Sequence, residues 1–122
     1  MKLTEFQIGR VETILKQWHE AGRAEFERNY KQLDYDSPTY GKKYKVGSKY
    51  VSLETGTSGA FLVDIGTGIV YEIKAYGVAN KRKIVGEAWK ETFHGAQLHD
   101  CRYIRGPYDN RSHLWIPNEG TA

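Results

Sequence analysis

The chain has 122 residues, of which 27% are charged and 39% are hydrophobic, and its formal net charge is +3. This length accommodates one hydrophobic core, so we expect a single domain over residues 1–122. The balance of charged and apolar residues excludes a disordered chain, and no run of about 18 apolar residues could cross a membrane. We therefore expect a soluble, cytoplasmic protein with no membrane partner.

The first residues and the cysteine content agree with that compartment. Met1 leads into a charged amphipathic segment, without the basic and then apolar pattern of a signal peptide. Cys101 is the one cysteine of the sequence, so no internal disulfide can form, as is usual in a reducing compartment.

Residues 4–33 carry the periodicity of a long amphipathic helix. Thr4 and Gln7 match a capping box, which marks where the helix begins. Glycine inside a helix costs about 1 kcal/mol relative to alanine, so Gly22 permits a kink or a division into two helices. The apolar residues recur every three or four positions: Ile8, Val11, Leu15, Trp18, Gly22, Phe26, Tyr30 and Leu33.

An unbroken helix of this length is larger than the body it belongs to. It would extend about 42 Å, whereas a globule of this size has a radius of gyration of about 14 Å. The overhanging apolar side needs a covering surface, and a symmetric copy is the commonest one. We therefore expect a homo-oligomer.

Residues 42–86 predict an antiparallel β-sheet, and together with the helix they indicate an α+β fold. The connections between the strands are too short for parallel neighbours. In the last long strand Ile69, Tyr71 and Ile73 alternate with Val70 and Glu72, which separates a core face from a more polar face. We expect strands at 42–46, 49–53, 60–65, 69–76 and 83–85, a turn at 78–82 and a short helix at 86–93.

Residues 87–122 comprise the short helix and an irregular tail rich in arginine and aromatic residues. Arginine forks bind phosphates and aromatic faces stack on bases, so this composition favours a nucleotide ligand. Salt-bridging arginines and aromatic side chains that close the core are the alternative interpretation. The candidate ligand-binding residues are Tyr76, Asn80, Arg102, Tyr103, Arg105, Arg111 and Trp115.

Three alternatives from other functional classes remain, the plainest of which is a structural subunit with no small ligand. Asp64 followed by Glu72 and Lys74 has the order of a D…E-x-K nuclease, in which two carboxylates hold Mg²⁺. The lysine clusters at 42–49 and 81–83 would suit a nucleic-acid backbone or an acidic host protein.

No metal, cofactor or catalytic residue is expected in the leading interpretation. His94, His99, Asp100 and Cys101 are close in sequence, but their spacing does not organise a tetrahedral zinc site.

The segment 67–77, followed by the basic run 80–83 and Gly86, resembles small proteins encoded by bacteriophages and prophages. Among these the chain is most similar to the Thoeris anti-defence sponges. The resemblance implies a non-enzymatic homo-oligomer in the host cytoplasm that captures a cyclic ADP-ribose-type immune signal, or a cyclic oligonucleotide, without cleaving it. It transfers no ligand residue to this sequence, so the candidate residues above depend on their chemistry alone.

Overall fold

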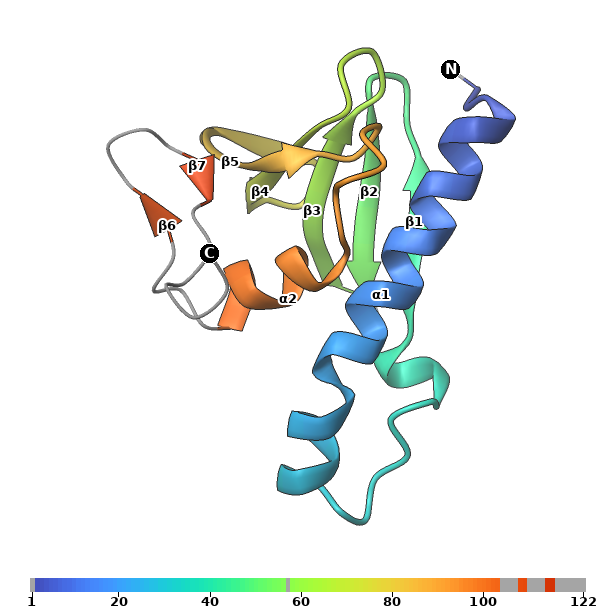
Figure 1. The fold of residues 1–122 in the computed structure, drawn as a ribbon, viewed down its shortest axis with the longest axis vertical. Coiled ribbons are helices and arrows are strands. Elements are labelled where there is room, and N and C mark those ends of the chain that lie inside the picture. The colour runs from blue at the N-terminus through green and yellow to red at the C-terminus, as the bar shows by residue number, and fades with distance from the viewer. Residues whose placement is uncertain (1, 57, 104–107, 110–113, 116–122) are drawn as a thin grey trace.

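A computed structural model describes residues 2–56, 58–103, 108–109 and 114–115. It confirms the α+β class: the helix α1 (Glu5–Asn29) packs against an antiparallel sheet (Figure 1). Its other elements are η1 (Pro38–Tyr40), β1 (Lys42–Val46), β2 (Tyr50–Thr55), β3 (Ser58–Asp64), β4 (Ile69–Ala75), β5 (Val78–Glu87), α2 (Ala96–Tyr103), β6 (Tyr108–Asp109) and β7 (Leu114–Trp115).

The start of α1 is the capping box that the sequence predicts. The Thr4 hydroxyl accepts from the Gln7 N–H at 3.1 Å, and the Thr4 N–H donates to the Gln7 side chain at 3.0 Å. The helix runs unbroken through Gly22 and ends at Asn29, four residues before the predicted end at residue 33. Tyr30 leaves helical geometry, with φ −134° and ψ 64°, because the chain turns back there toward the helix.

Five strands, β1 to β5, form the antiparallel sheet, each paired with the next in sequence. Within the described tail, β7 joins β5 in parallel, with Ile84 opposite Leu114. The predicted turn at 78–82 is wrong, since β5 begins at Val78 and the hairpin turns at Tyr76 and Gly77 instead. Gly77 has φ +77°, a conformation that glycine adopts without steric cost, and this makes the early turn possible.

The predicted helix at 86–93 is also wrong. β5 continues to Glu87, where it pairs with Ile69 of β4, and this pairing outweighs the local helical preference. The helix forms later, as α2, where the Gln97 side chain accepts from the His94 N–H at 3.1 Å. Arg10 of α1 holds the intervening turn by donating to the carbonyls of Ala88, Lys90 and Phe93.

The hydrophobic core lies between α1 and one face of the sheet. Val11, Ile14 and Trp18 are each 1% exposed, and the Trp18 ring meets Phe61 edge-on at 5.5 Å. In β4 the core residue is Val70, whereas Tyr71 is buried outside this cluster. Apolar residues therefore lie on both faces of β4, and the predicted separation into one core face and one polar face does not hold there.

The C-terminal half of α1 extends beyond the sheet, as Figure 1 shows. The segment that follows the helix returns along this overhang through η1 to β1. Part of the apolar side that a second copy was expected to cover is thus covered by the chain itself. Among the described residues, no helix combines the length and apolar character needed to cross a membrane.

Candidate functional site

A pocket of about 390 Å³ opens where the overhanging part of α1 meets the returning segment and the first residue of β1. Such a volume is in the range of small-molecule sites. Its lining residues are Trp18, Gly22, Glu25, Phe26, Asn29, Tyr30, Tyr35, Tyr40, Lys42, Thr55 and His99.

The walls of the pocket are mainly aromatic. Phe26 of α1 is the common neighbour, with ring centroids 4.7 Å from Tyr35, 4.7 Å from Tyr40 and 5.1 Å from Tyr30. Phe26 belongs to the apolar stripe of the helix, and the returning segment supplies the tyrosines. Tilted rings at such distances attract one another, so the wall is formed before any ligand arrives.

Lys42 places one positive charge within this aromatic surface. Its ammonium lies 5.2 Å from the Trp18 ring and 5.1 Å from the Tyr35 ring, which is within cation–π range. It also donates to the Tyr35 hydroxyl and to the Tyr40 carbonyl, both at 3.3 Å. Lys42 therefore ties β1 to the returning segment and to α1.

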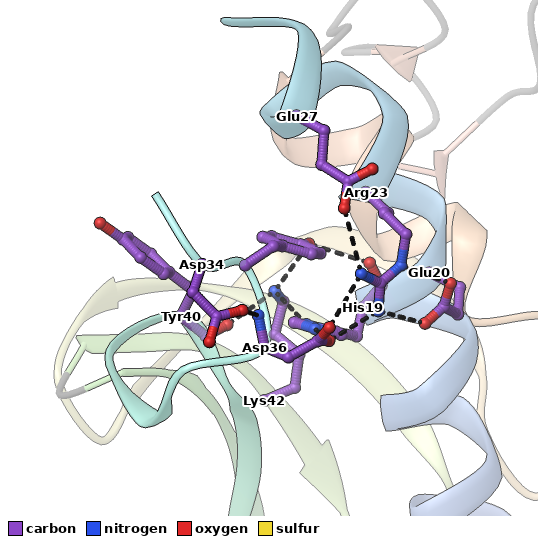
Figure 2. A network of polar contacts seen from close by, with 9 residues as sticks. His19, Glu20, Arg23, Glu27, Asp34, Asp36, Tyr40 and Lys42 are labelled. Atoms are coloured by element: carbon purple, nitrogen blue, oxygen red, sulfur yellow. Dashed lines mark hydrogen bonds and ion pairs between the residues drawn. The ribbon is translucent and has the colours of Figure 1, made fainter. Parts of the chain in front are cut away.

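A polar network behind the pocket fixes the returning segment to the helix (Figure 2). Arg23 of α1 donates to both carboxylate oxygens of Asp36, at 2.6 and 3.0 Å, and also contacts Glu20 and Glu27. The hydrogen bond from Arg23 is the main reason why the pKa of Asp36 is lowered. Because the carboxylates of this network are largely exposed, the network serves mainly to position the segment.

His19 lies between this network and the pocket wall in its neutral form. Its ring stacks on Tyr35 at 4.1 Å, and burial, followed by the charge of Lys42, lowers the pKa of His19. Since the Lys42 ammonium donates to Nδ1 at 3.3 Å, the ring proton is on Nε2, which donates to Asp36. The Tyr35 hydroxyl donates to the His19 carbonyl at 2.9 Å, so Tyr35 is held from both sides.

Tyr76 and Asn80, which were predicted to bind a ligand, do not line this pocket. Tyr76 is 56% exposed, and its hydroxyl donates to the buried carboxylate of Glu54 at 2.6 Å, which raises the pKa of Tyr76. The Asn80 side chain accepts from the Arg82 N–H.

The other predicted ligand residues belong to the tail. Arg102 and Tyr103 end α2, and Trp115 ends β7, but only their backbone is described. Arg105 and Arg111 lie outside the described residues.

The sequence did contain a signal for the pocket. Tyr30, Tyr35 and Tyr40 recur five residues apart after the helix, beside Lys42. We expected only a turn in this region, because Pro38 and the polar residues around it favour one.

The nuclease pattern is not assembled into one site. β3 and β4 pair with Phe61 opposite Glu72, so Asp64 is three residues further along the strand, about 10 Å away, and on the opposite face by alternation. The Asp64 carboxylate instead accepts from the N–H groups of Gly66 and Thr67 and stabilises the β3–β4 turn. Within the described parts of the chain, no group of three or more potential ligands could hold a metal ion.

No protein-family model matches this chain, and no curated protein or solved structure matches it either. Function must therefore be argued from the site itself.

Proposed function

We propose that this protein binds a small nucleotide in the pocket between α1 and β1 and retains it without cleaving it. The observation that carries the proposal is the aromatic wall around Phe26, beside the charge of Lys42. Stacking of a base on an aromatic side chain contributes about 1–3 kcal/mol and tolerates any base. A planar heterocycle therefore matches the pocket better than a sugar or a metal ion does.

The polar residues of the lining add a means of orienting such a ligand. Glu25, Asn29 and His99 line the pocket together with the rings, and His99 lies 3.5 Å from Glu25. A few polar groups in a mainly apolar cleft are typical of small-molecule sites. In this proposal the rings hold the base, and these groups contact its polar edge or the ribose.

The resemblance to small phage proteins narrows the proposal to one biological role. We propose an anti-defence sponge that removes a cyclic ADP-ribose-type signal, or a cyclic oligonucleotide, from the host cytoplasm by mass action. In this role the protein is not an enzyme, and its partners are the signal and other copies of itself.

The test is to incubate the purified protein with cyclic ADP-ribose isomers and cyclic di- and trinucleotides and to measure thermal stabilisation. A ligand at about 100 times its dissociation constant adds about 2.7 kcal/mol to the free energy of unfolding. The samples are then heat-denatured, and the supernatant is analysed by liquid chromatography. Intact ligand supports sequestration, whereas consumed ligand would show an enzyme.

Two exposed tyrosines provide a matched pair of variants that locates the site. Tyr30, 54% exposed, lines the pocket, whereas Tyr76, 56% exposed, lies at the β4–β5 turn. We expect Tyr30→Ala to weaken nucleotide binding about tenfold or more through lost stacking, and Tyr76→Ala to leave binding unchanged. The reverse result would place the ligand at the β4–β5 hairpin, among the residues that sequence reasoning selected.

A second candidate function is binding of a nucleic-acid backbone by the β4–β5 hairpin. Lys74, Lys81 and Arg82 are exposed there, and Tyr76 and Val78 are exposed beside them. Several neutralised phosphates give a steep dependence of affinity on salt, whereas a pocket for one small nucleotide gives a shallow one. A steep salt slope for an oligonucleotide, together with no response to small nucleotides, would favour this second function.

A further inference from the structure

Two buried polar atoms meet no hydrogen-bond partner in the described part of the chain: the indole nitrogen Nε1 of Trp18 and the hydroxyl oxygen of Thr55. Both residues line the pocket. Trp18 is 1% exposed, so water does not compensate its N–H from outside. The great majority of buried polar groups in folded proteins are paired, and two exceptions at one pocket therefore require an explanation.

The two atoms come from different elements of the fold. Trp18 comes from the buried stripe of α1, whereas Thr55 ends β2 directly opposite Lys42 of β1. The backbone beyond Thr55 is fixed as well, because the Gly56 N–H donates to the Gly41 carbonyl at 2.9 Å. Both positions are thus set by regular secondary structure, and neither side chain belongs to a loose loop.

We propose that the inner end of the pocket reads the hydrogen-bond acceptor edge of a planar ring, such as the carbonyl or ring nitrogen of a nucleobase. The Trp18 N–H donates to that acceptor, and the Thr55 hydroxyl makes a second hydrogen bond to the same edge. This inference rests on the proposed function and adds the part of the ligand that is recognised. An indole nitrogen can only donate, so the ligand must supply the acceptor.

The chemistry of the lining excludes two other ligand classes from this position. The Lys42 ammonium already lies over the faces of Trp18 and Tyr35, so a ligand cation would meet a like charge there. A phosphate would lose its hydration against mainly aromatic walls, and the Lys42 ammonium already uses its three N–H groups on His19, Tyr35 and Tyr40. A neutral ring with an acceptor avoids both penalties, and any phosphate of the ligand stays nearer the opening.

The experiment uses fragments and the indole N–H resonance of Trp18 in the wild-type protein, assigned with a Trp18→Phe variant. Adenine, uracil and nicotinamide are planar rings with acceptors, indole is a planar ring with a donor only, and tetramethylammonium is a cation. We expect the three acceptor rings to bind and to shift the Trp18 N–H resonance downfield. Indole is expected to bind about tenfold more weakly, as the loss of one hydrogen bond predicts, and tetramethylammonium is expected not to bind.

The variant Thr55→Val removes the hydroxyl and keeps the shape of the side chain. We expect it to weaken adenine binding about tenfold while the unfolding temperature of the free protein is unchanged or higher, because an unpaired buried hydroxyl is removed. Thr13→Val, on the exposed side of α1, is the control and is expected to bind adenine like the wild type. A purely structural role of Thr55 would lower the unfolding temperature and leave the affinity unchanged.

The outcomes separate this inference from the proposed function. If whole nucleotides bind but the Trp18 resonance does not move, or Thr55→Val binds normally, the inference is overturned and the proposed function stands. If fragments bind as described but no nucleotide does, the inference holds and the proposed function fails. If indole binds as tightly as adenine, or nothing binds at all, acceptor recognition is refuted.

Discussion

At the scale of single residues, His19 shows how the fold controls a charge next to the candidate site. It accepts from Lys42 at Nδ1 and donates to Asp36 from Nε2. A protonated ring could no longer accept from Lys42 and would repel it. The neutral form is therefore part of the structure that holds Tyr35 and the pocket wall in place.

We predict that His19 makes the stability of the protein sensitive to pH below neutrality. Because the pKa of His19 is lowered from 6.5 in the folded state, the unfolded chain takes up this proton first as the pH falls. The contribution of His19 is present above about pH 6.5 and is lost as the pH falls from there through the lowered folded pKa. Urea unfolding at pH 7.5, 6.5 and 5.5 measures the effect.

The control for this prediction is His19→Gln, which cannot titrate. Its free energy of unfolding is expected to change less between pH 7.5 and pH 5.5 than that of the wild type. Asp36 and Glu20, whose carboxyl pKa values are lowered by Arg23, act only at more acidic pH, below their ordinary values. Equal pH slopes for variant and wild type would show that His19 is protonated without cost.

At the scale of elements, two glycines of α1 differ in their surroundings. Gly9 is subject only to the helix preference of its residue type, whereas Gly22 is also constrained by tertiary contacts. Gly9 is exposed and has nothing within 4 Å of the position that a Cβ would occupy. At Gly22 a Cβ would lie 2.7 Å from the Tyr35 hydroxyl and 3.3 Å from the His99 ring. Gly22 therefore lets Tyr35 and His99 approach the helix at the pocket.

We predict opposite effects of alanine at these two positions. Gly9→Ala is expected to raise the free energy of unfolding by about 1 kcal/mol, because alanine favours the helix. Gly22→Ala gains the same preference but displaces Tyr35, and we expect a net loss of about 1 to 3 kcal/mol, as for other overpacked sites. Chemical denaturation compares the two. A stabilised Gly22→Ala variant would mean that Tyr35 moves aside at little cost.

At the scale of the whole molecule, the overhang of α1 leaves an apolar surface near the pocket opening. Tyr30 is 54% exposed and Leu33 is 47% exposed, although the Tyr30 ring contacts Phe26. Apolar patches beside a binding site often mark contacts with a further copy. The homo-oligomer remains a proposal, and we propose that the contact between subunits lies at the end of the helix.

We predict that Leu33→Glu shifts the protein toward the monomer, because a carboxylate would be buried in the proposed contact. Light scattering after size exclusion measures the mass over a range of concentrations. Val78→Glu, at a position 50% exposed on the β4–β5 hairpin, is the control and is expected to leave the mass unchanged. A wild-type protein that is monomeric at every concentration would contradict the proposal.

Local signals in the sequence were sufficient for the start of α1, for the antiparallel pairing of the strands and for β1. The capping box at Thr4 set the start of α1, short connections made the strands antiparallel, and β1 occupies the predicted residues 42–46. These features depend on neighbours in sequence, so pattern reasoning reaches them. The α+β class of this protein was determined at that level.

Only the tertiary structure decided where the pocket is and what lines it. Trp18, Tyr35, Lys42 and Thr55 come from four segments, and the return of the chain at Tyr30 brings them together. The end of α1, the length of β5 and the position of α2 were likewise set by pairing and packing between distant residues. Periodicity describes one segment at a time, whereas this site exists because an overhanging helix and the chain that follows it cover each other.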